Sequence, residues 1–279
     1  IYYINEPGVF SGMRTSDLQG SWEEMESTLN RDLPDPYAPG RFETAKKLRR
    51  EYPDNYMVGN WWALFFERFI ALQPEAEFLM DLYTDRDKIV RFGWKICECF
   101  CGIVGGFGEI GRDGIFFSDD LGFSNQLIFS PQIFREVFKP WYKAIFERAH
   151  SHGMHVIMHS CGYLWEIIPD LIDIGLDVHH FQPSVMDIKT YVREYGKDLT
   201  FFGGIDIQDF MIKNDPEGIR NGIKEIFETL DHDGGGYMAG PSNTLMSDTP
   251  FENIVAMYEA MNEFAPRAQL KSPAEVSTE

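Results

Sequence analysis

The chain has 279 residues and a formal net charge of −19. This length can bury one large core and suits a single α/β barrel. The acidic balance excludes the usual nucleic-acid-binding proteins, because these displace counterions with basic patches. No window approaches the roughly 20 continuous apolar residues that a membrane-spanning helix needs.

Glycines and prolines interrupt residues 1–50, which predicts an irregular, partly helical lead-in packed on the main domain. Within it we expect a short strand at Tyr2–Ile4 and a helix over 41–51 that ends before Pro53. Residues 51–265 form the predicted catalytic domain, and residues 266–279 form a C-terminal tail.

From residue 56 onward, short apolar segments alternate with amphipathic ones. The predicted strands cover 56–59, 114–118, 154–159, 176–181, 199–203 and 236–239. The predicted helices cover 61–72, 85–104, 131–152, 164–174, 187–195, 216–230 and 250–264. This alternation is typical of parallel βαβ units, in either a closed barrel or a doubly wound sheet.

Polar residues follow the ends of several predicted strands, where α/β barrels carry their active sites. We therefore predict an α/β fold of the (β/α)8, TIM-type class. Six strands are clear and one at the start is doubtful, which leaves open whether an N-terminal piece of the barrel is missing.

His159 and Cys161 are the most informative of these residues. They end a predicted strand two positions apart, so their side chains point the same way. An imidazole and a thiolate on one face make half of a zinc site, although such residues are also common in ordinary cores. Zinc takes three or four protein ligands in most sites, so the other ligands stay open.

Three carboxylates are candidate catalytic residues. Asp119 and Asp120 follow a buried strand and could ligate metal, bind substrate or transfer a proton; the alternative is loop capping. Asp206 follows two glycines and could hold substrate or instead cap a helix. Candidate cofactor-binding residues at the same mouth are Gln182, Ser242 and Asn243.

The four cysteines show no disulfide-like framework, which predicts a reducing, cytoplasmic location. Three of them, Cys97, Cys99 and Cys101, sit on one predicted helix among apolar neighbours, where simple burial is the favoured interpretation.

Six short motifs in order along the chain resemble the uroporphyrinogen decarboxylase superfamily, and most closely its corrinoid-dependent methyltransferase branch. The motifs are Asp119–Gly122, Ser130-Pro131, His159–Gly162, Gly203–Asp206, Gly234–Tyr237 and Thr249–Ile254. Members of this superfamily fold as (β/α)8 barrels. The decarboxylases carry an arginine-rich N-terminal segment, and nothing in this chain matches it.

The resemblance implies a zinc-dependent methyltransferase that moves a methyl group between a small methoxy or otherwise methylated donor and a corrinoid, supplied by a partner protein or as co-substrate. It implies zinc on His159 and Cys161. The branch also uses a later cysteine, near Gly240–Leu245, but no cysteine follows position 161. This departure favours the members that demethylate methoxy compounds.

Other residues and functions remain open at this stage. Trp61 and Trp62 lie near a strand end and could line a pocket for an apolar or cationic methyl donor, although most of their aromatic neighbours suit a core. The alternative functions are a metal-free decarboxylase that uses Asp206 or Asp120, and a noncatalytic barrel that binds a corrinoid. A homodimer is neither indicated nor excluded.

Overall fold

The computed structural model describes residues 2–4, 13–15, 21–231 and 236–265. These residues form two compact units that divide between His180 and Phe181. The predicted tail, 266–279, lies outside the described residues. The domain boundaries predicted from the sequence stay predictions.

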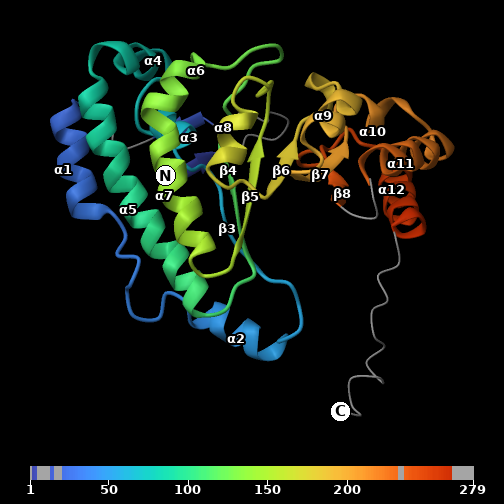
Figure 1. The fold of residues 1–279 in the computed structure, drawn as a ribbon, viewed down its shortest axis with the longest axis horizontal. Helices are drawn as coiled ribbons and strands as arrows, with labels where there is room; N and C mark the ends of the chain where they lie inside the picture. The colour runs from blue at the N-terminus through green and yellow to red at the C-terminus, as the bar shows by residue number, and fades with distance from the viewer. Residues whose placement is uncertain (1, 5–12, 16–20, 232–235, 266–279) are drawn as a thin grey trace. The chain divides into compact units, whose positions relative to one another are not determined.

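The first unit contains strands β3–β6 and the helices between them (Figure 1). Its strands are β1 Tyr2–Ile4, β2 Met13–Thr15, β3 Val58–Trp61, β4 Gly114–Ser118, β5 His155–Ser160 and β6 Val178–Phe181, of which β6 ends one residue into the second unit. Its helices are α1 Trp22–Asp32, α2 Glu43–Glu51, α3 Phe66–Leu72, α4 Glu75–Thr84, α5 Arg86–Glu109, α6 Pro131–Ile133, the π-helical turn η1 Phe134–Phe138, α7 Lys139–His150 and α8 Ile168–Asp173.

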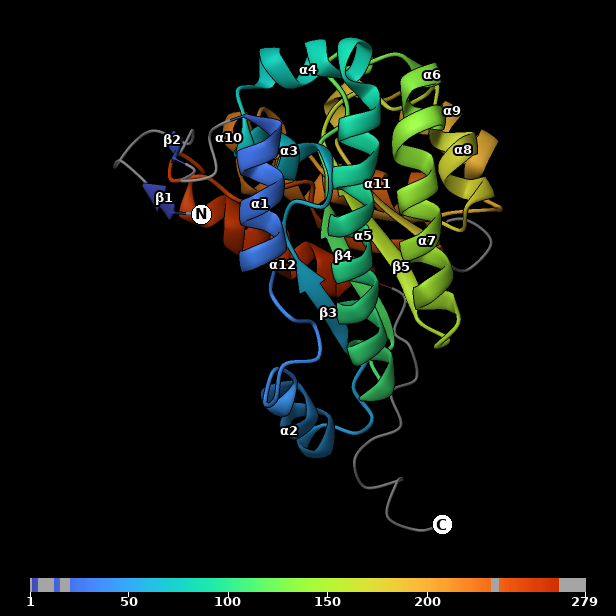
Figure 2. The ribbon, with the colours of Figure 1, turned by 90° about the vertical axis from the view of Figure 1, so that its left-hand side faces the viewer.

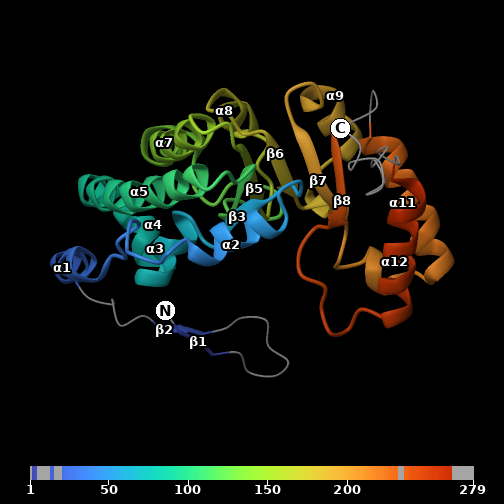
Figure 3. The same cartoon turned by 90° about the horizontal axis from the view of Figure 1, so that it is seen from below.

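The second unit contains strands β7 and β8 with their helices. Its strands are β7 Thr200–Ile205 and β8 Tyr237–Pro241. Its helices are the 3-10 turn η2 Pro183–Val185, α9 Ile188–Tyr195, α10 Phe210–Lys213, α11 Pro216–Leu230 and α12 Phe251–Phe264. Helices α11 and α12 lie side by side (Figure 3) and enclose an apolar core with Ile205 of β7.

Strands β3 to β8 alternate with helices; β4 pairs in parallel with β3 and β5 in the first unit, and β7 pairs in parallel with β8 in the second. This arrangement confirms the predicted α/β class. Strands β4 and β8 and helix α11 lie within two residues of the predicted ranges. The register between β4 and β5 aligns Ser118 with His159, so the residues that follow these two strands are neighbours.

Helices α5 and α7 lie side by side against β4 and β5 (Figures 1 and 2). Helix α5 continues five residues beyond the predicted end, through a glycine-rich segment. Its glycines make room for packing: a Cβ on Gly93 would lie 2.1 Å from the buried Trp141 ring, and one on Gly106 would lie 2.1 Å from Phe42. Tertiary packing therefore compensates for the low helix propensity of glycine.

Two predicted helices have different bounds in the structure. The predicted helix over 61–72 begins only at Phe66, because the preceding residues form a turn held by side chains that follow β4. The predicted helix over 131–152 ends at His150 and includes the π-helical turn at Phe134–Phe138. Helices α1 and α4 were not predicted individually.

Candidate metal centre

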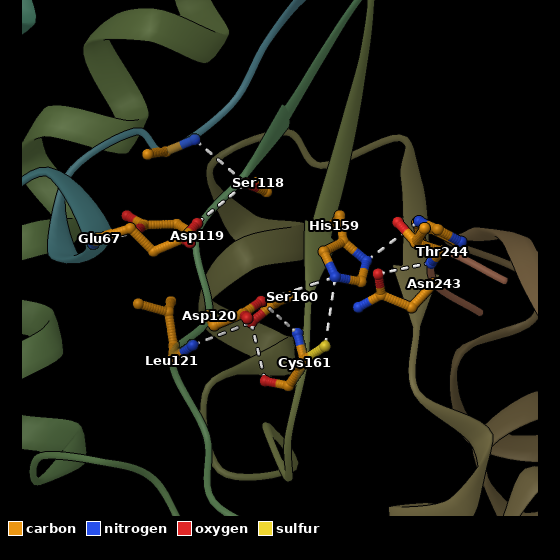
Figure 4. A network of polar contacts seen from close by, with 12 residues as sticks. Glu67, Ser118, Asp119, Asp120, Leu121, His159, Ser160, Cys161, Asn243 and Thr244 are labelled. Atoms are coloured by element: carbon orange, nitrogen blue, oxygen red, sulfur yellow. Dashed lines mark hydrogen bonds and ion pairs between the residues drawn. The ribbon is translucent and has the colours of Figure 1, made fainter. Parts of the chain in front are cut away.

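The two neighbouring acids after β4 face opposite sides of the strand (Figure 4). The Asp119 carboxylate is fully buried and accepts hydrogen bonds from the backbone N–H groups of Phe65, Phe66 and Glu67 at 2.8–2.9 Å, as well as from the Tyr142 hydroxyl. These three N–H groups begin helix α3 and have no partner within the helix. Asp119 therefore anchors the start of α3.

Burial raises the pKa of Asp119 to about 6, even though the hydrogen bonds to its carboxylate act in the opposite direction. The neighbouring Ser118 hydroxyl donates to buried Glu67 at 2.9 Å and accepts from the Ala63 N–H at 3.1 Å. These contacts give Asp119 and Glu67 a structural role in holding the turn before α3. A catalytic role for Asp119 stays a prediction that its contacts do not favour.

Asp120 points toward the end of β5, where it meets His159 and Cys161 (Figure 4). The Cys161 Sγ lies 3.3 Å from His159 Nε2, and Asp120 Oδ1 lies 3.6 Å from the same nitrogen. One ligand atom from each residue falls within 4.8 Å of the others, and within the described part of the chain this is the group of three that could hold a metal.

The spacing of these atoms fits a metal ion. Tetrahedral zinc with nitrogen and oxygen at about 2.0–2.1 Å and sulfur at about 2.3 Å places its ligand atoms roughly 3.3–3.6 Å apart. The observed separations of 3.3 and 3.6 Å are already close to that geometry. Three protein ligands leave a fourth position open, which is the arrangement of catalytic rather than structural zinc sites.

His159 is prepared to act as a ligand. Its ring is 1% exposed, and burial lowers its pKa to about 4, so the imidazole is neutral near pH 7. Its Nδ1 lies 3.0 Å from Nδ1 of His180 on β6, so that one of these nitrogens donates to the other. This bond orients the ring and leaves Nε2 facing Asp120 and Cys161, as ligand histidines require. His180 was not among the site residues predicted from the sequence.

Two glycines bring the loops after β4 and β5 into backbone contact. A Cβ on Gly162 would lie 2.0 Å from the Gly122 carbonyl oxygen, and Gly162 has a φ of +90°. The Cys161 N–H donates to Asp120 Oδ1 at 2.8 Å, and the Leu121 N–H donates to Ser160 Oγ at 3.1 Å. Only glycine permits this approach, and the approach places the carboxylate beside the thiol.

The remaining candidate residues belong to the second unit. Asp206 Oδ2 accepts hydrogen bonds from the N–H groups of Asp209 and Phe210, which is the helix-capping alternative. Gln182 Nε2 donates to Ser184 Oγ at 3.0 Å, Ser242 is buried and its N–H donates to the Ile205 carbonyl, and Asn243 Oδ1 accepts from the Thr244 N–H. The functional roles of these four residues stay predictions.

None of the described helices is both long and apolar enough to cross a membrane.

Cys97 and Cys99 are buried, and their thiols donate to the carbonyl groups of Trp141 and Pro34. These contacts agree with the predicted structural role of the two residues.

Comparisons with known proteins place these features in a family. A Methanosarcina mazei protein described as a methylated-thiol–coenzyme M methyltransferase is 27% identical over 151 residues. This match covers 53% of the chain but only 38% of the relative, so the chain spans well under half of that protein's length.

A solved structure described as a methyltransferase from Methanosarcina mazei has a TM-score of 0.65 and 21% identity. It covers 81% of this chain and 64% of its own, and this likeness shows the fold. The family model described as uroporphyrinogen decarboxylase (URO-D) matches residues 71–264, which is more than half of the chain. The fold of this family is a TIM barrel, as the sequence predicted. The chain therefore belongs to the uroporphyrinogen decarboxylase family.

Proposed function

We propose that the protein is a metal-assisted methyltransferase that transfers a methyl group from a small methylated donor, such as a methoxy compound, to the cobalt of a corrinoid. Three side chains, Asp120, His159 and Cys161, would hold the metal, for which zinc is the best match to the mixed nitrogen, sulfur and oxygen donors. The convergence of their ligand atoms within 4.8 Å is the observation that carries the proposal.

Asp120 takes the place of the later cysteine that the methyltransferase branch uses. A carboxylate is a harder ligand than a thiolate, and it leaves a bound metal less electron-rich. When bound here, zinc supplies Lewis acidity to the heteroatom that carries the methyl group. This difference supports a demethylase acting on methoxy compounds, whereas the methylated thiol named for the relative is the alternative donor.

The reaction is a displacement at carbon. The electron pair of a cobalt(I) corrinoid forms the new cobalt–carbon bond while the carbon–heteroatom bond breaks, and the heteroatom leaves with its electrons and takes a proton from solvent. His159, held by its hydrogen bond with His180, would bind the metal as a neutral imidazole, whereas the Cys161 thiol would lose its proton when the metal binds. The enzyme contributes mainly alignment and stabilisation of the leaving group.

Metal analysis joined to an activity assay tests the proposal. We expect the purified protein to contain about one zinc per chain and Cys161→Ala to lose it, whereas the matched control Cys101→Ala, on helix α5, keeps it. Donor-dependent methylation of cob(I)alamin, followed by its absorbance, should fall at least a hundredfold in Cys161→Ala. A protein that is fully active in this assay without metal contradicts the proposal.

A cytoplasmic location and a corrinoid protein as partner form part of the same proposal. None of the four cysteines, all of them in the described part of the chain, forms a disulfide, which suits a reducing compartment.

A further inference from the structure

Two consecutive tryptophans at the end of β3 have different surroundings. The Trp61 ring stacks on Phe100, Phe107 and Phe117 with centroid separations of 5.3–6.5 Å and belongs to the core between β4 and α5. The Trp62 ring is 47% exposed and stacks on the His159 imidazole at 5.7 Å, with an angle of 27° between the planes. One face of the Trp62 indole is therefore committed to a candidate metal ligand.

The turn that carries Trp62 is held firmly. The next residue, Ala63, has a φ of +63°, a left-handed conformation that few residues other than glycine adopt. The Arg68 guanidinium donates to the carbonyl oxygens of both Trp62 and Ala63, and Ser118 Oγ accepts from the Ala63 N–H. Strained backbone of this kind persists only where surrounding contacts impose it, and it concentrates at functional sites.

On this basis, and resting on the function proposed above, we propose that Trp62 is a substrate-binding residue that contacts the methyl group of the donor. The Trp62 indole stacks on the His159 imidazole, which is one of the proposed metal ligands. A substrate bound at the metal beside His159 Nε2 would therefore lie next to this indole. The indole offers an apolar, polarisable surface that suits a methyl group on oxygen or sulfur.

The charges at the site favour a neutral donor over a quaternary ammonium. Asp120 and the Cys161 thiolate together carry two negative charges, which a divalent cation offsets. A cationic donor would then depend on the indole alone, and a nitrogen with four substituents has no lone pair to offer the metal. The substrate class is therefore a methyl ether or methyl thioether, which do have such a lone pair.

A matched pair of ligands tests the methyl contact directly. Methanethiol and hydrosulfide present the same sulfur with and without a methyl group, and each can be titrated into the cobalt(II)-loaded protein and followed by sulfur-to-cobalt charge-transfer absorbance. We expect Trp62→Ala to weaken methanethiol binding about tenfold and to leave hydrosulfide binding within twofold. Trp62→Phe should restore most of the methanethiol affinity, and Trp94→Ala, which removes an exposed indole on α5, should change neither.

Each result has a defined meaning. Equal losses for both ligands in Trp62→Ala overturn the proposal, because the indole would then act only by positioning His159; no loss for either ligand also overturns it. Cobalt stoichiometry and thermal unfolding show whether the variant is folded and loaded. A wild-type protein that takes up no cobalt(II) refutes the metal site itself, and this outcome is distinct from a loaded protein without methyl selectivity. In the cob(I)alamin assay, a methyl ether and a methyl thioether as donors decide which heteroatom is preferred.

Discussion

The two ends of strands β4 and β5 carry similar residues and use them differently. At the N-terminal ends, Asp113, which precedes β4, pairs with the Arg49 guanidinium and accepts from the Met57 N–H. Asp177, which precedes β6, lies 2.8 Å from His150 and accepts from the N–H of Val156 on β5. Each of these carboxylates is thus matched by a cation, an imidazole or a backbone donor, and ties neighbouring elements together.

At the C-terminal ends, a carboxylate, an imidazole and a thiol point at one another instead. Three groups that all offer lone pairs are poorly suited to stabilise the fold, but together they suit a cation. The comparison teaches that residue type alone does not separate structural from functional groups. What distinguishes the metal centre is that ligand atoms from three such groups converge on one point, and α/β barrels carry their active sites where the strands end.

The largest expected effect comes from breaking the contact between the loops at the C-terminal ends. Gly162→Ala would put a Cβ 2.0 Å from the Gly122 carbonyl oxygen at a φ of +90°. We expect a loss of at least about 3 kcal/mol in the free energy of unfolding and loss of stoichiometric zinc. Urea unfolding and metal analysis measure the two effects.

Gly153→Ala is the matched control. Gly153 also has a positive φ, +70°, but a Cβ there would meet nothing within 4 Å. Its cost should be about 1 kcal/mol, with metal binding unchanged. Equal destabilisation by the two substitutions would show that the loop contact matters little.

A pair of isosteric substitutions tests whether the carboxylates at the two ends of the strands have different roles. Asp120→Asn keeps an oxygen that can accept from the Cys161 N–H but removes the charge, so we expect zinc affinity to fall on the order of a hundredfold with little change in unfolding. Asp113→Asn should lower the free energy of unfolding and leave zinc affinity unchanged. Competition with a chromogenic chelator reports the affinities; an unaltered affinity in Asp120→Asn would remove this carboxylate from the site.

The contact between His159 and His180 predicts a smaller effect on the metal. His180→Leu removes the group that holds Nδ1 of His159, and such losses weaken metal binding by about 10- to 100-fold. His180→Asn, which places a polar atom near the original nitrogen, should recover much of the affinity. His150→Leu at the opposite end serves as the control, and an equal effect from it would argue against a specific role for His180.

The smallest effect concerns stability in acid. Desolvation acts to raise the pKa of Asp113, but hydrogen bonds from Met57 and Arg49, with the charges of Arg49 and Arg112, outweigh it and lower the pKa. A lowered folded-state pKa contributes stability that is present above the unfolded value near 3.9 and is lost as the pH falls through the folded value. Because the side chain is 38% exposed, solvent screening limits the contribution to about 1 kcal/mol.

Thermal unfolding between pH 6 and pH 2 checks this expectation. The Asp113→Asn variant should be less stable than the wild type at pH 6. This difference in stability between the two proteins should become smaller as the pH falls below 4. A difference that stays constant across this range would show that ionisation of Asp113 does not contribute.

Much of the architecture followed from local patterns in the sequence. Alternating apolar segments located strands β3 to β8, since strands buried on both faces consist of continuous hydrophobic residues. The spacing of His159 and Cys161 placed both side chains on one side of β5, because residues two apart in a strand share a face. A resemblance in six motifs led to the correct family.

Only the tertiary structure assigned roles to the neighbours of these residues. The sequence could not choose between Asp119 and Asp120; the register of β4 against β5 and the Gly122–Gly162 contact place Asp120 beside Cys161 and send Asp119 to the start of α3. The exposed Trp62, in the turn after β3, and the buried His180, on β6, likewise contact His159. Such contacts join residues that are 21 to 97 positions apart in the sequence (180 − 159 and 159 − 62). Local periodicity predicts which face of an element a side chain occupies, but it does not predict which distant side chains come into contact.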